Sequence, residues 1–208
     1  MSQTVNERYP DVMTLSHRLA TPHDVPALTA LMTAAIGELQ RGFLTEEEIA
    51  ASRKLMGLDS QLIADRTYFV IEEDGEDSLL GGRPDAKPAS TFAGRPLIAG
   101  CGGWSRRATL YGGDHSPGRD AAVLDPAVDA ARVRAMYTSP AFARRGVGRL
   151  ILSLCEAAAK AEGFSRIELA GTLAGEPLYR ACGYAVIERL TDDRGGVPVP
   201  LARMGKAI

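Results

Sequence analysis

The sequence predicts a single α/β domain in which helices flank a mixed central sheet of about seven strands. Strand-like and helix-periodic segments alternate along nearly the whole chain, in the order β-α-α-β-β-β-α-β-α-β-β. The chain has 208 residues, of which 45% are hydrophobic, which is enough apolar side chain to bury a full core. Residues 1–16 are polar and unpatterned. We therefore expect a loose arm over 1–16 and one domain over 17–208.

The amino-terminal part of the domain is predicted to form one strand followed by two helices. Residues 17–20 form the strand, and Pro22 then marks the first turn of a helix. The apolar residues of this helix recur at helical spacing: Leu28, Leu31, Met32, Ala35 and Leu39. A second helix is expected to begin at Thr45, which forms a capping box with Glu48, and to end at Gly57.

Two buried strands and two long loops are predicted in the middle of the chain. The strands are 67–72 (TYFVIE) and 97–104 (LIAGCGGW), which are rich in β-branched, aromatic and other apolar residues. The segments 74–96 and 109–120 are rich in Gly, Pro, Asp and Ser, a composition that is typical of loops. Asp125, which precedes a proline, predicts a short helical turn.

The carboxy-terminal part of the chain is predicted to contain four strands and two helices. A strand at 131–138 leads into a glycine loop, and the helix after this loop is expected to end at Gly163. The next elements are a strand at 166–169, a short helix at 176–182 and a strand at 184–190. The last strand, 197–204, contains prolines, which lack a backbone N–H, so we expect it at an edge of the sheet.

Composition narrows the class of protein and its partners. A formal net charge of −2 argues against a nucleic-acid partner, because proteins that bind polyanions usually carry a basic excess. No apolar run has membrane-spanning or signal-peptide length, so we expect a cytoplasmic protein with no membrane partner. Cys101, Cys155 and Cys182 are too few and too widely spaced for a disulfide framework or a zinc site. We therefore expect reduced thiols and no metal.

The segment 144–149 (RRGVGR) places glycines and arginines between a predicted strand and a predicted helix. It is not a Walker A loop, because Gly148 is followed by Arg149 and not by Lys and then Ser or Thr. It is not a dinucleotide fingerprint, because the third glycine position is Ile151. Free N–H groups and the dipole at a helix start bind anions, so the loop predicts a site for phosphate oxygens. The alternative is a tight turn with solvated arginines.

The longer segment 136–151 (MYTSPAFARRGVGRLI) resembles motif A of the GNAT N-acetyltransferase superfamily. The resemblance implies that the loop holds the pyrophosphate of acetyl-CoA, that the preceding strand pairs with the pantetheine arm, and that a backbone N–H near Tyr137 donates to the oxyanion. The cofactor-binding residues carried over by position are Met136, Tyr137, Thr138, Arg144, Arg145, Gly146, Val147, Gly148 and Arg149. The family's Arg or Gln position is Ala143 here, a departure for which Arg144 or Arg145 is expected to compensate.

The segment 171–184 (GTLAGEPLYRACGY) resembles motif B of the same family. In that family a tyrosine lies four residues before a Gly-aromatic pair, which is Gly183 and Tyr184 here, so the resemblance assigns Tyr179 as the catalytic residue. A tyrosine hydroxyl, with an ordinary pKa near ~10, stays protonated at neutral pH and can protonate a departing thiolate. The alternative is a half-buried tyrosine that packs against the sheet with its hydroxyl in water.

The resemblance implies an acyltransferase, specifically a GNAT-type N-acetyltransferase that uses acetyl-CoA as its cosubstrate and needs no metal. The expected reaction moves the acetyl group to a primary amine of a small molecule or peptide by direct attack on the thioester. One alternative is a non-catalytic acyl-CoA-binding or regulatory module of the same fold. Another is a protein lysine or N-terminal acetyltransferase. The sequence leaves open which amine is the acceptor and whether the protein forms a homodimer.

The sequence does not assign the general base or the role of Trp104. No general base can be assigned, because Glu72 and Glu73 at a strand end, and Asp114 with His115 in the second loop, occupy positions where solvated side chains are common. Trp104 ends a predicted strand, where it either packs over the sheet or lines the acceptor pocket.

Overall fold

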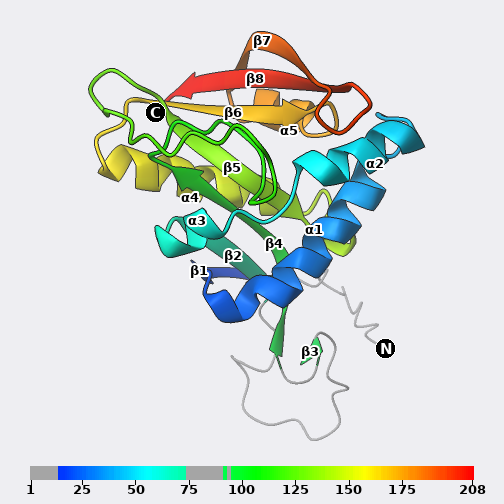
Figure 1. Cartoon of the computed structure of the whole chain (residues 1–208). Helices are drawn as coiled ribbons and strands as arrows, with labels where there is room; N and C mark the ends of the chain where they lie inside the picture. Colours follow the sequence, from blue (N-terminus) through cyan, green and yellow to red (C-terminus); the bar gives the residue numbers. More distant parts are fainter. Residues whose placement is uncertain (1–13, 74–90, 93–94) are drawn as a thin grey trace, which may run out of the picture.

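The computed structural model describes residues 14–73, 91–92 and 95–208 (Figure 1). Two predictions extend beyond these ranges. Residues 1–13 of the expected arm, and residues 74–90 and 93–94 of the first expected loop, lie outside the described residues.

A mixed, eight-stranded sheet forms the centre of the fold and runs in the order β1-β2-β4-β5-β6-β8-β7, with β3 paired to β4 (Figure 1). The strands are β1 (Leu15–Leu19), β2 (Tyr68–Glu73), β3 (Thr91–Phe92), β4 (Arg95–Ser105), β5 (Ala131–Thr138), β6 (Arg166–Thr172), β7 (Ala185–Asp192) and β8 (Val199–Ala207). Only β5 and β6 are parallel neighbours, and the other pairs are antiparallel. All the strands predicted from the sequence are present, and β3 is additional.

The described end of the predicted loop 74–96 is strand and not loop. β3 and the start of β4 form a hairpin in which Thr91 pairs with Pro96 and Phe92 with Arg95. Such a short strand is held by backbone pairing and has no side-chain periodicity. The loop-like composition around it therefore concealed it in the sequence.

Five helices accompany the sheet: α1 (Val25–Leu39), α2 (Glu46–Leu55), α3 (Ser60–Ala64), α4 (Val147–Ala161) and α5 (Glu176–Ala181). The predicted capping box of α2 is confirmed, because the Thr45 hydroxyl accepts from the Glu48 N–H and the Glu48 carboxylate accepts from the Thr45 N–H. The sequence analysis missed α3, which is only five residues long. A helix of this length makes too few turns to show apolar periodicity.

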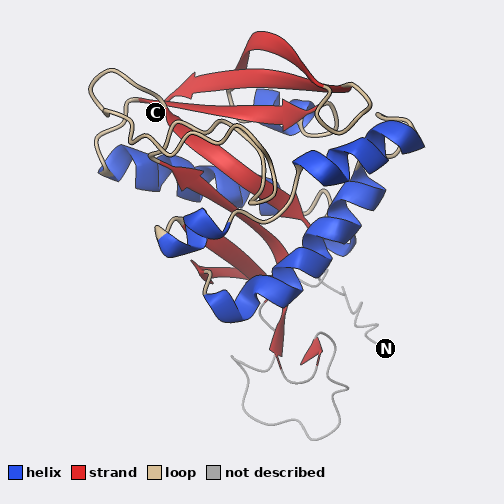
Figure 2. Ribbon diagram, viewed as in Figure 1, coloured by secondary structure: helices blue, strands red, loops and turns tan. Residues whose placement is uncertain are grey.

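The two faces of the sheet carry separate apolar cores. α4 covers one face and buries Ile151 and Cys155 there, whereas α1 covers the other face and buries Leu28 and Met32 against Val70 of β2 (Figures 1 and 2). The apolar faces predicted for these two helices therefore point into the cores, as the helical spacing requires.

The last strand does not lie at the edge of the sheet, as its prolines had suggested. β8 is inserted between β6 and β7, and β7 is the edge strand. Pro200 pairs with Thr191 of β7, while pairing with β6 begins one residue later, at Leu201 and Thr172. The proline therefore lies where β8 has a neighbour on one side only, and its missing N–H interrupts no ladder with β6.

The parallel pair β5 and β6 separates after two paired positions. Ala131 pairs with Ile167 and Arg132 with Glu168, and the described pairing ends there. At this closed end, Glu168 accepts hydrogen bonds from Arg132 Nη1 (2.6 Å) and from Arg203 Nε of β8 (2.9 Å). The ion pairs fasten three strands together at the point where the fork begins, and the strands diverge beyond it.

A bulge in β5 sets which side chains point into the fork. Gly103 of β4 pairs with Arg134 and Cys101 pairs with Tyr137, so β5 has one extra residue between these positions. Ala135, within the bulge, has a φ of 49°, in the left-handed region that residues other than glycine rarely adopt. As a result, Arg134 and Tyr137 lie on the same face of β5.

A buried hydrogen bond holds the bulge. The hydroxyl of Tyr68, on β2, donates to the carbonyl of Ala135 over 2.7 Å, and the Tyr68 side chain is fully buried. On the opposite face of β5, Val133 and Met136 pack into the core formed with α4. The strain at Ala135 is thus offset by a hydrogen bond from a strand two positions away in the same sheet.

We expect Tyr68→Phe to lower the free energy of unfolding by about 1–3 kcal/mol, because it leaves the buried Ala135 carbonyl unpaired. Urea unfolding measures this change. Thr33→Ala is the control, since it removes an exposed hydroxyl on α1 that donates to Thr29, and it should change stability by less than about 0.5 kcal/mol. A loss as small as that for Tyr68→Phe would show that its hydroxyl does not hold the bulge.

Candidate active site

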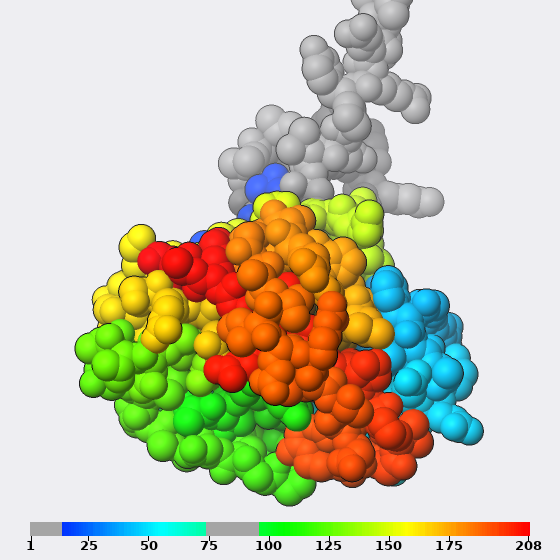
Figure 3. Space-filling view, turned by 90° about the horizontal axis from the view of Figure 1, so that it is seen from above, coloured from blue at the N-terminus to red at the C-terminus, as the bar shows by residue number. Residues whose placement is uncertain are grey.

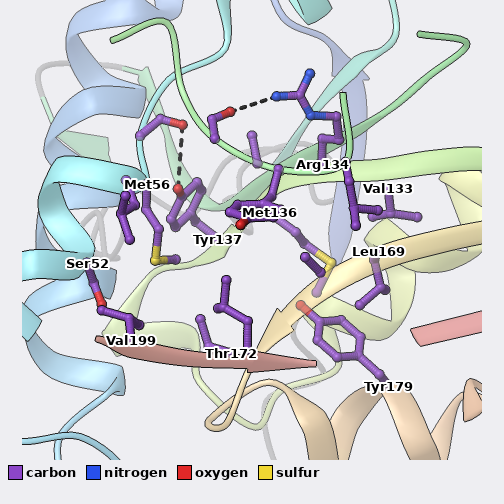
Figure 4. A pocket seen from close by; sticks show the side chains of 18 residues that line it. Ser52, Met56, Val133, Arg134, Met136, Tyr137, Leu169, Thr172, Tyr179 and Val199 are labelled. Carbon is purple, nitrogen blue, oxygen red and sulfur yellow. Dashed lines mark hydrogen bonds between the residues drawn. The ribbon is translucent and has the colours of Figure 1, made fainter. Parts of the chain in front are cut away.

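Two adjoining cavities occupy the region where β5 and β6 diverge. The larger has a volume of about 710 Å³, and the smaller has a volume of about 100 Å³. The residues that line both cavities are Met56, Met136, Tyr137, Thr172 and Tyr179. Because these residues are common to both, the two cavities meet beside Tyr179, and Figure 4 shows the smaller one from close by.

The start of α4 borders the larger cavity and presents free backbone donors. The segment Gly146 to Arg149 has N–H groups for which no described residue supplies an acceptor, and no side chain caps the helix. Gly146 is the cap residue, with a φ of 87°, a conformation that strongly favours glycine. The helix dipole adds roughly half a positive charge at this end. The arrangement can hold an anion.

The two loop glycines are needed for different physical reasons. A Cβ on Gly146 would meet no other atom within 4 Å, so this position depends on its positive φ. A Cβ on Gly148 would lie 2.6 Å from Cδ2 of Leu178, so this glycine lets α4 approach α5 closely. At Gly148 the neighbour within the protein is Leu178.

All but one of the predicted cofactor-binding residues line the larger cavity: Met136, Tyr137, Thr138, Arg144, Gly146, Val147, Gly148 and Arg149. The exception is Arg145, whose guanidinium lies 5.7 Å from the ring centre of Phe142. Neither Arg144 nor Arg149 takes part in the ion pairs found among the described residues. These two cations therefore remain available to a ligand.

The edge of β5 that faces β6 is open along the cavity. β4 covers the other edge, pairing Gly100 with Thr138 and Cys101 with Tyr137. Beyond Arg132, no described strand covers the side toward β6. Backbone groups of 136–138 on this side can therefore pair with an extended ligand, as one strand pairs with another.

Tyr179 is held rigidly on α5 at the junction of the two cavities. Its ring packs on Gly171 and Gly175, where a Cβ would approach ring atoms to 2.6 and 2.8 Å, and it makes an edge contact with Tyr184. The hydroxyl points into the smaller cavity near Met136 and donates to no described residue (Figure 4). Burial raises the pKa of Tyr179 to about 12, so the hydroxyl stays protonated at neutral pH.

Other side chains considered in the sequence lie away from this junction. Trp104 is buried against Phe164, with ring centres 6.1 Å apart, so the packing alternative for Trp104 is confirmed. Glu72 accepts hydrogen bonds from Arg18 on β1 and lines neither cavity. Asp114 accepts from the N–H of Ser60 and likewise lies outside both linings. Among the residues that the structure describes, no Asp or Glu lines either cavity at Tyr179.

One wall of the smaller cavity was not predicted from the sequence. The loop 109–120, expected only as a connecting loop, contributes Leu110, Tyr111 and Gly112 to the lining. The end of α2 and the residues after it contribute Met56 and Gly57. Tyr111 and the pair Gly112 and Gly113 were the features of the sequence that could have indicated a cavity wall. Only the folded chain shows which residues they face.

The amino-acid sequence matches the profile of one known protein family. The sequence profile described as the acetyltransferase (GNAT) family matches residues 33–184, which include both the glycine loop and Tyr179. The chain belongs to the GNAT family of acetyltransferases. The predicted family and fold class are therefore confirmed, and the protein is a transferase of the N-acetyltransferase type. A comparison of the sequence with curated proteins found no match.

Solved structures share the fold of this GNAT chain at low sequence identity. An N-acetyltransferase from Rhodopseudomonas palustris has a TM-score of 0.60 and 18% identity, over 96% of this chain and all of the other. The yncA protein of Salmonella typhimurium, solved with its cofactor acetyl-CoA, has a TM-score of 0.55 and 16% identity, over 93% of each chain. The PaiA N-acetyltransferase of Thermoplasma acidophilum, in complex with coenzyme A, has a TM-score of 0.54 and 13% identity, over 94% of this chain and all of the other.

Two further observations concern the described part of this GNAT chain. It contains no group of three or more His, Cys, Asp and Glu side chains that could hold a metal ion. None of the helices in the described ranges combines the length and the apolar composition that crossing a lipid bilayer requires.

The raised pKa of Tyr179 predicts a loss of stability in alkali. The unfolded chain releases this proton near pH ~10, whereas the folded chain releases it near pH 12, so the contribution of Tyr179 to stability is complete below pH 10 and is lost as the pH rises toward 12. Urea unfolding at pH 9 and pH 11 should show a larger loss for wild type than for Tyr179→Phe, by about 1 kcal/mol. The other tyrosines are common to both proteins and cancel. Equal losses would mean that Tyr179 titrates normally.

Proposed function

We propose that this protein transfers the acetyl group of acetyl-CoA to a primary amine of a small molecule or peptide. The observation that carries the proposal is the row of free N–H groups at 146–149, flanked by Arg144 and Arg149, at a cavity that leads to the hydroxyl of Tyr179. The non-catalytic alternative is less well supported, because a binding module has no need for a protonated hydroxyl at the junction of two cavities.

The larger cavity suits the parts of coenzyme A. The free N–H groups of α4 and the guanidinium groups of Arg144 and Arg149 fit the oxygens of a pyrophosphate. The open edge of β5 and the apolar side chains of Met136 and Leu178 fit the amide groups and the aliphatic carbons of a pantetheine arm. The relatives solved with acetyl-CoA and coenzyme A share the fold, which supports the same use here.

Acetyl-CoA, when bound, supplies a thioester carbonyl as the acetyl donor. A backbone N–H near Tyr137, on the open side of β5, donates to the thioester oxygen as negative charge develops on it. The acceptor nitrogen attacks in its neutral form, and we assign no residue as the base that deprotonates the amine before the attack. The exclusion of water by Met136 and the buried strands strengthens the backbone dipoles at this point.

Tyr179 controls the proton at the leaving sulfur. Its pKa of about 12 lies well above the ordinary thiol value of ~8.5, so a free tyrosinate is not a favourable product. The hydroxyl instead donates a hydrogen bond as the carbon–sulfur bond breaks and passes its proton to sulfur while it gains one from the amine nitrogen. The nitrogen must lose a proton to become an amide, so the atoms and charges balance: amine and thioester become amide and thiol.

The proposed reaction is tested by following free thiol with acetyl-CoA and a panel of primary amines. Thiol should appear only when both substrates are present, in equal amount to the acetylated amine detected by mass spectrometry. Coenzyme A should also raise the melting temperature, because it binds the native state. Binding without turnover of any amine or peptide would favour the acyl-CoA-binding module.

Tyr179→Phe should lower kcat by about 10²-fold or more, while the affinity for coenzyme A changes by less than about 3-fold, because the hydroxyl acts as sulfur leaves. Tyr184→Phe is the matched control, since its ring contacts that of Tyr179 but lines neither cavity, and it should retain kcat. Steady-state kinetics and calorimetry separate the two effects. An unchanged kcat in Tyr179→Phe would assign the proton transfer to water or to another group.

Arg149→Glu should weaken coenzyme A binding by about 10-fold or more, because it replaces a cation beside the pyrophosphate with an anion. Arg145→Glu changes the net charge equally, but Arg145 does not line the cavity, so its affinity should fall by less than about 3-fold. Titration calorimetry at two salt concentrations measures both. Equal losses in the two variants would indicate a general charge effect and not a phosphate site at 146–149.

A further inference from the structure

The smaller cavity has an almost entirely uncharged wall. Its described lining contains no Asp, Glu, Lys or His side chain, and Arg134 is its one charged residue. The apolar side chains come from separate parts of the fold: Leu55 and Met56 at the end of α2, Leu110 in the inserted loop, Leu169 on β6, and Val199 and Leu201 on β8. Four distant segments therefore build one compartment beside Tyr179, and its wall combines these apolar side chains with the uncharged hydroxyl groups of Ser52, Tyr111, Tyr137 and Thr172.

The charge of Arg134 is already neutralised within the protein. Its Nη1 lies 2.6 Å from Oδ2 of Asp59, and the side chains of Arg134 and Asp59 are 2% and 0% exposed. Its Nη2 donates to the carbonyl of Gly112 over 2.7 Å (Figure 4). Burial lowers the pKa of Arg134, and the Asp59 carboxylate opposes this shift. Arg119 shares the Asp59 carboxylate and also pairs with Asp114 over 3.1 Å, so two arginines are matched by two carboxylates. The cluster therefore presents no net charge to the cavity, although Arg134 Nε has no partner among the described residues.

The inserted loop 109–120 closes this compartment and is fixed at several points. Arg119 Nη2 donates to Oδ1 of Asp59 (2.6 Å), and the hydroxyl of Ser116 donates to the carbonyl of Leu55 (2.8 Å). Figure 2 shows this connection as a loop that crosses in front of β5. In Figure 3 it lies next to the β7–β8 turn, where Arg194 Nη1 donates to the carbonyl of Pro117 (2.7 Å). The wall is thus a built part of the fold.

The volume limits the size of the group that fits. An apolar cavity of roughly 150 Å³ holds a benzene molecule, so a cavity of about 100 Å³ that opens into a larger one suits a body of roughly four to six non-hydrogen atoms. The amine nitrogen of such a body would lie at the junction, beside Tyr179.

We infer that the acceptor is a primary monoamine whose remaining part is compact and uncharged, and that loop 109–120 determines this preference. The inference rests on the proposed acetyl transfer. A second ammonium or a carboxylate in this compartment would lose its hydration and find no counter-ion, which costs several kcal/mol. Diamines such as 1,4-diaminobutane, ω-amino acids such as 4-aminobutanoate, and other acceptors with a charge four or five atoms from the reacting nitrogen are therefore excluded.

Three amines of similar length test the inference on the wild-type protein: 3-methylbutylamine, 1,4-diaminobutane and 4-aminobutanoate. Values of kcat/KM are compared per unprotonated amine, so that differences in amine pKa cancel. We expect 3-methylbutylamine to exceed each charged amine by about 10-fold or more, given the desolvation of the extra charge. Equal use of the diamine would place the acceptor body outside the cavity. A preference for 4-aminobutanoate would make Arg134 a carboxylate site. Either result overturns the inference.

A charge placed in the wall provides the second test. Leu110→Asp adds a carboxylate to the lining and should shift the ratio of 1,4-diaminobutane to 3-methylbutylamine by about 10-fold toward the diamine, because the ammonium gains a partner. Val123→Asp is the matched control, since Val123 belongs to the same connection between β4 and β5 but is 68% exposed and lines neither cavity. It should leave the ratio unchanged. An unshifted ratio in folded Leu110→Asp would show that loop 109–120 does not contact the acceptor.

Failure of the inference can be told apart from failure of the proposed function. Stabilisation by coenzyme A and thiol release with some amine test acetyl transfer itself, whichever amine is preferred. If both occur and the charged amines are preferred, only the acceptor class is wrong. If no amine supports thiol release, the proposed function fails, and the inference fails with it. The KM for acetyl-CoA, measured with each variant, shows that the larger cavity is intact.

Discussion

The early separation of β5 from β6 is the constraint on which the rest of the structure depends. A parallel pair that continued would fill the region with backbone hydrogen bonds and leave no room for a ligand. Here Glu168, bound by Arg132 and Arg203, fastens the strands at the closed end, and the described pairing stops at the same place. The open edge of β5 and both cavities follow from this divergence.

The bulge at Ala135 turns that open edge into an organised site. An extra residue in β5 places Tyr137 on the face of Arg134 and leaves Met136 toward α4, so that one strand forms part of both cavities. The positive φ of Ala135 is an unfavourable conformation, and the hydrogen bond from the buried Tyr68 helps to hold it. The precision of the site thus depends on a residue two strands away in the sheet.

The two cavities differ in the kind of group that they accept. The larger one offers free N–H groups, unpaired arginines and an open strand edge, which are features that bind phosphates and amides. The smaller one offers apolar side chains, uncharged hydroxyl groups and the internally neutralised ion pair of Arg134 and Asp59. Tyr179 stands between them, with burial keeping its hydroxyl protonated. This division separates the recognition of a charged donor from that of an uncharged acceptor.

Features that depend on neighbouring residues were predictable from the amino-acid sequence. The capping box at Thr45, the strand at 131–138, the glycine loop and the position of Tyr179 are local patterns, and a local pattern is visible in one dimension. The tertiary structure alone decided features that depend on distant partners. β8 can lie inside the sheet because Pro200 falls beyond the end of the ladder between β6 and β8. Loop 109–120 forms a cavity wall because its Arg119, like Arg134 of β5, binds Asp59, which is distant in sequence. Strand order and buried ion pairs are set by contacts between residues far apart in sequence, and no spacing along the chain encodes them.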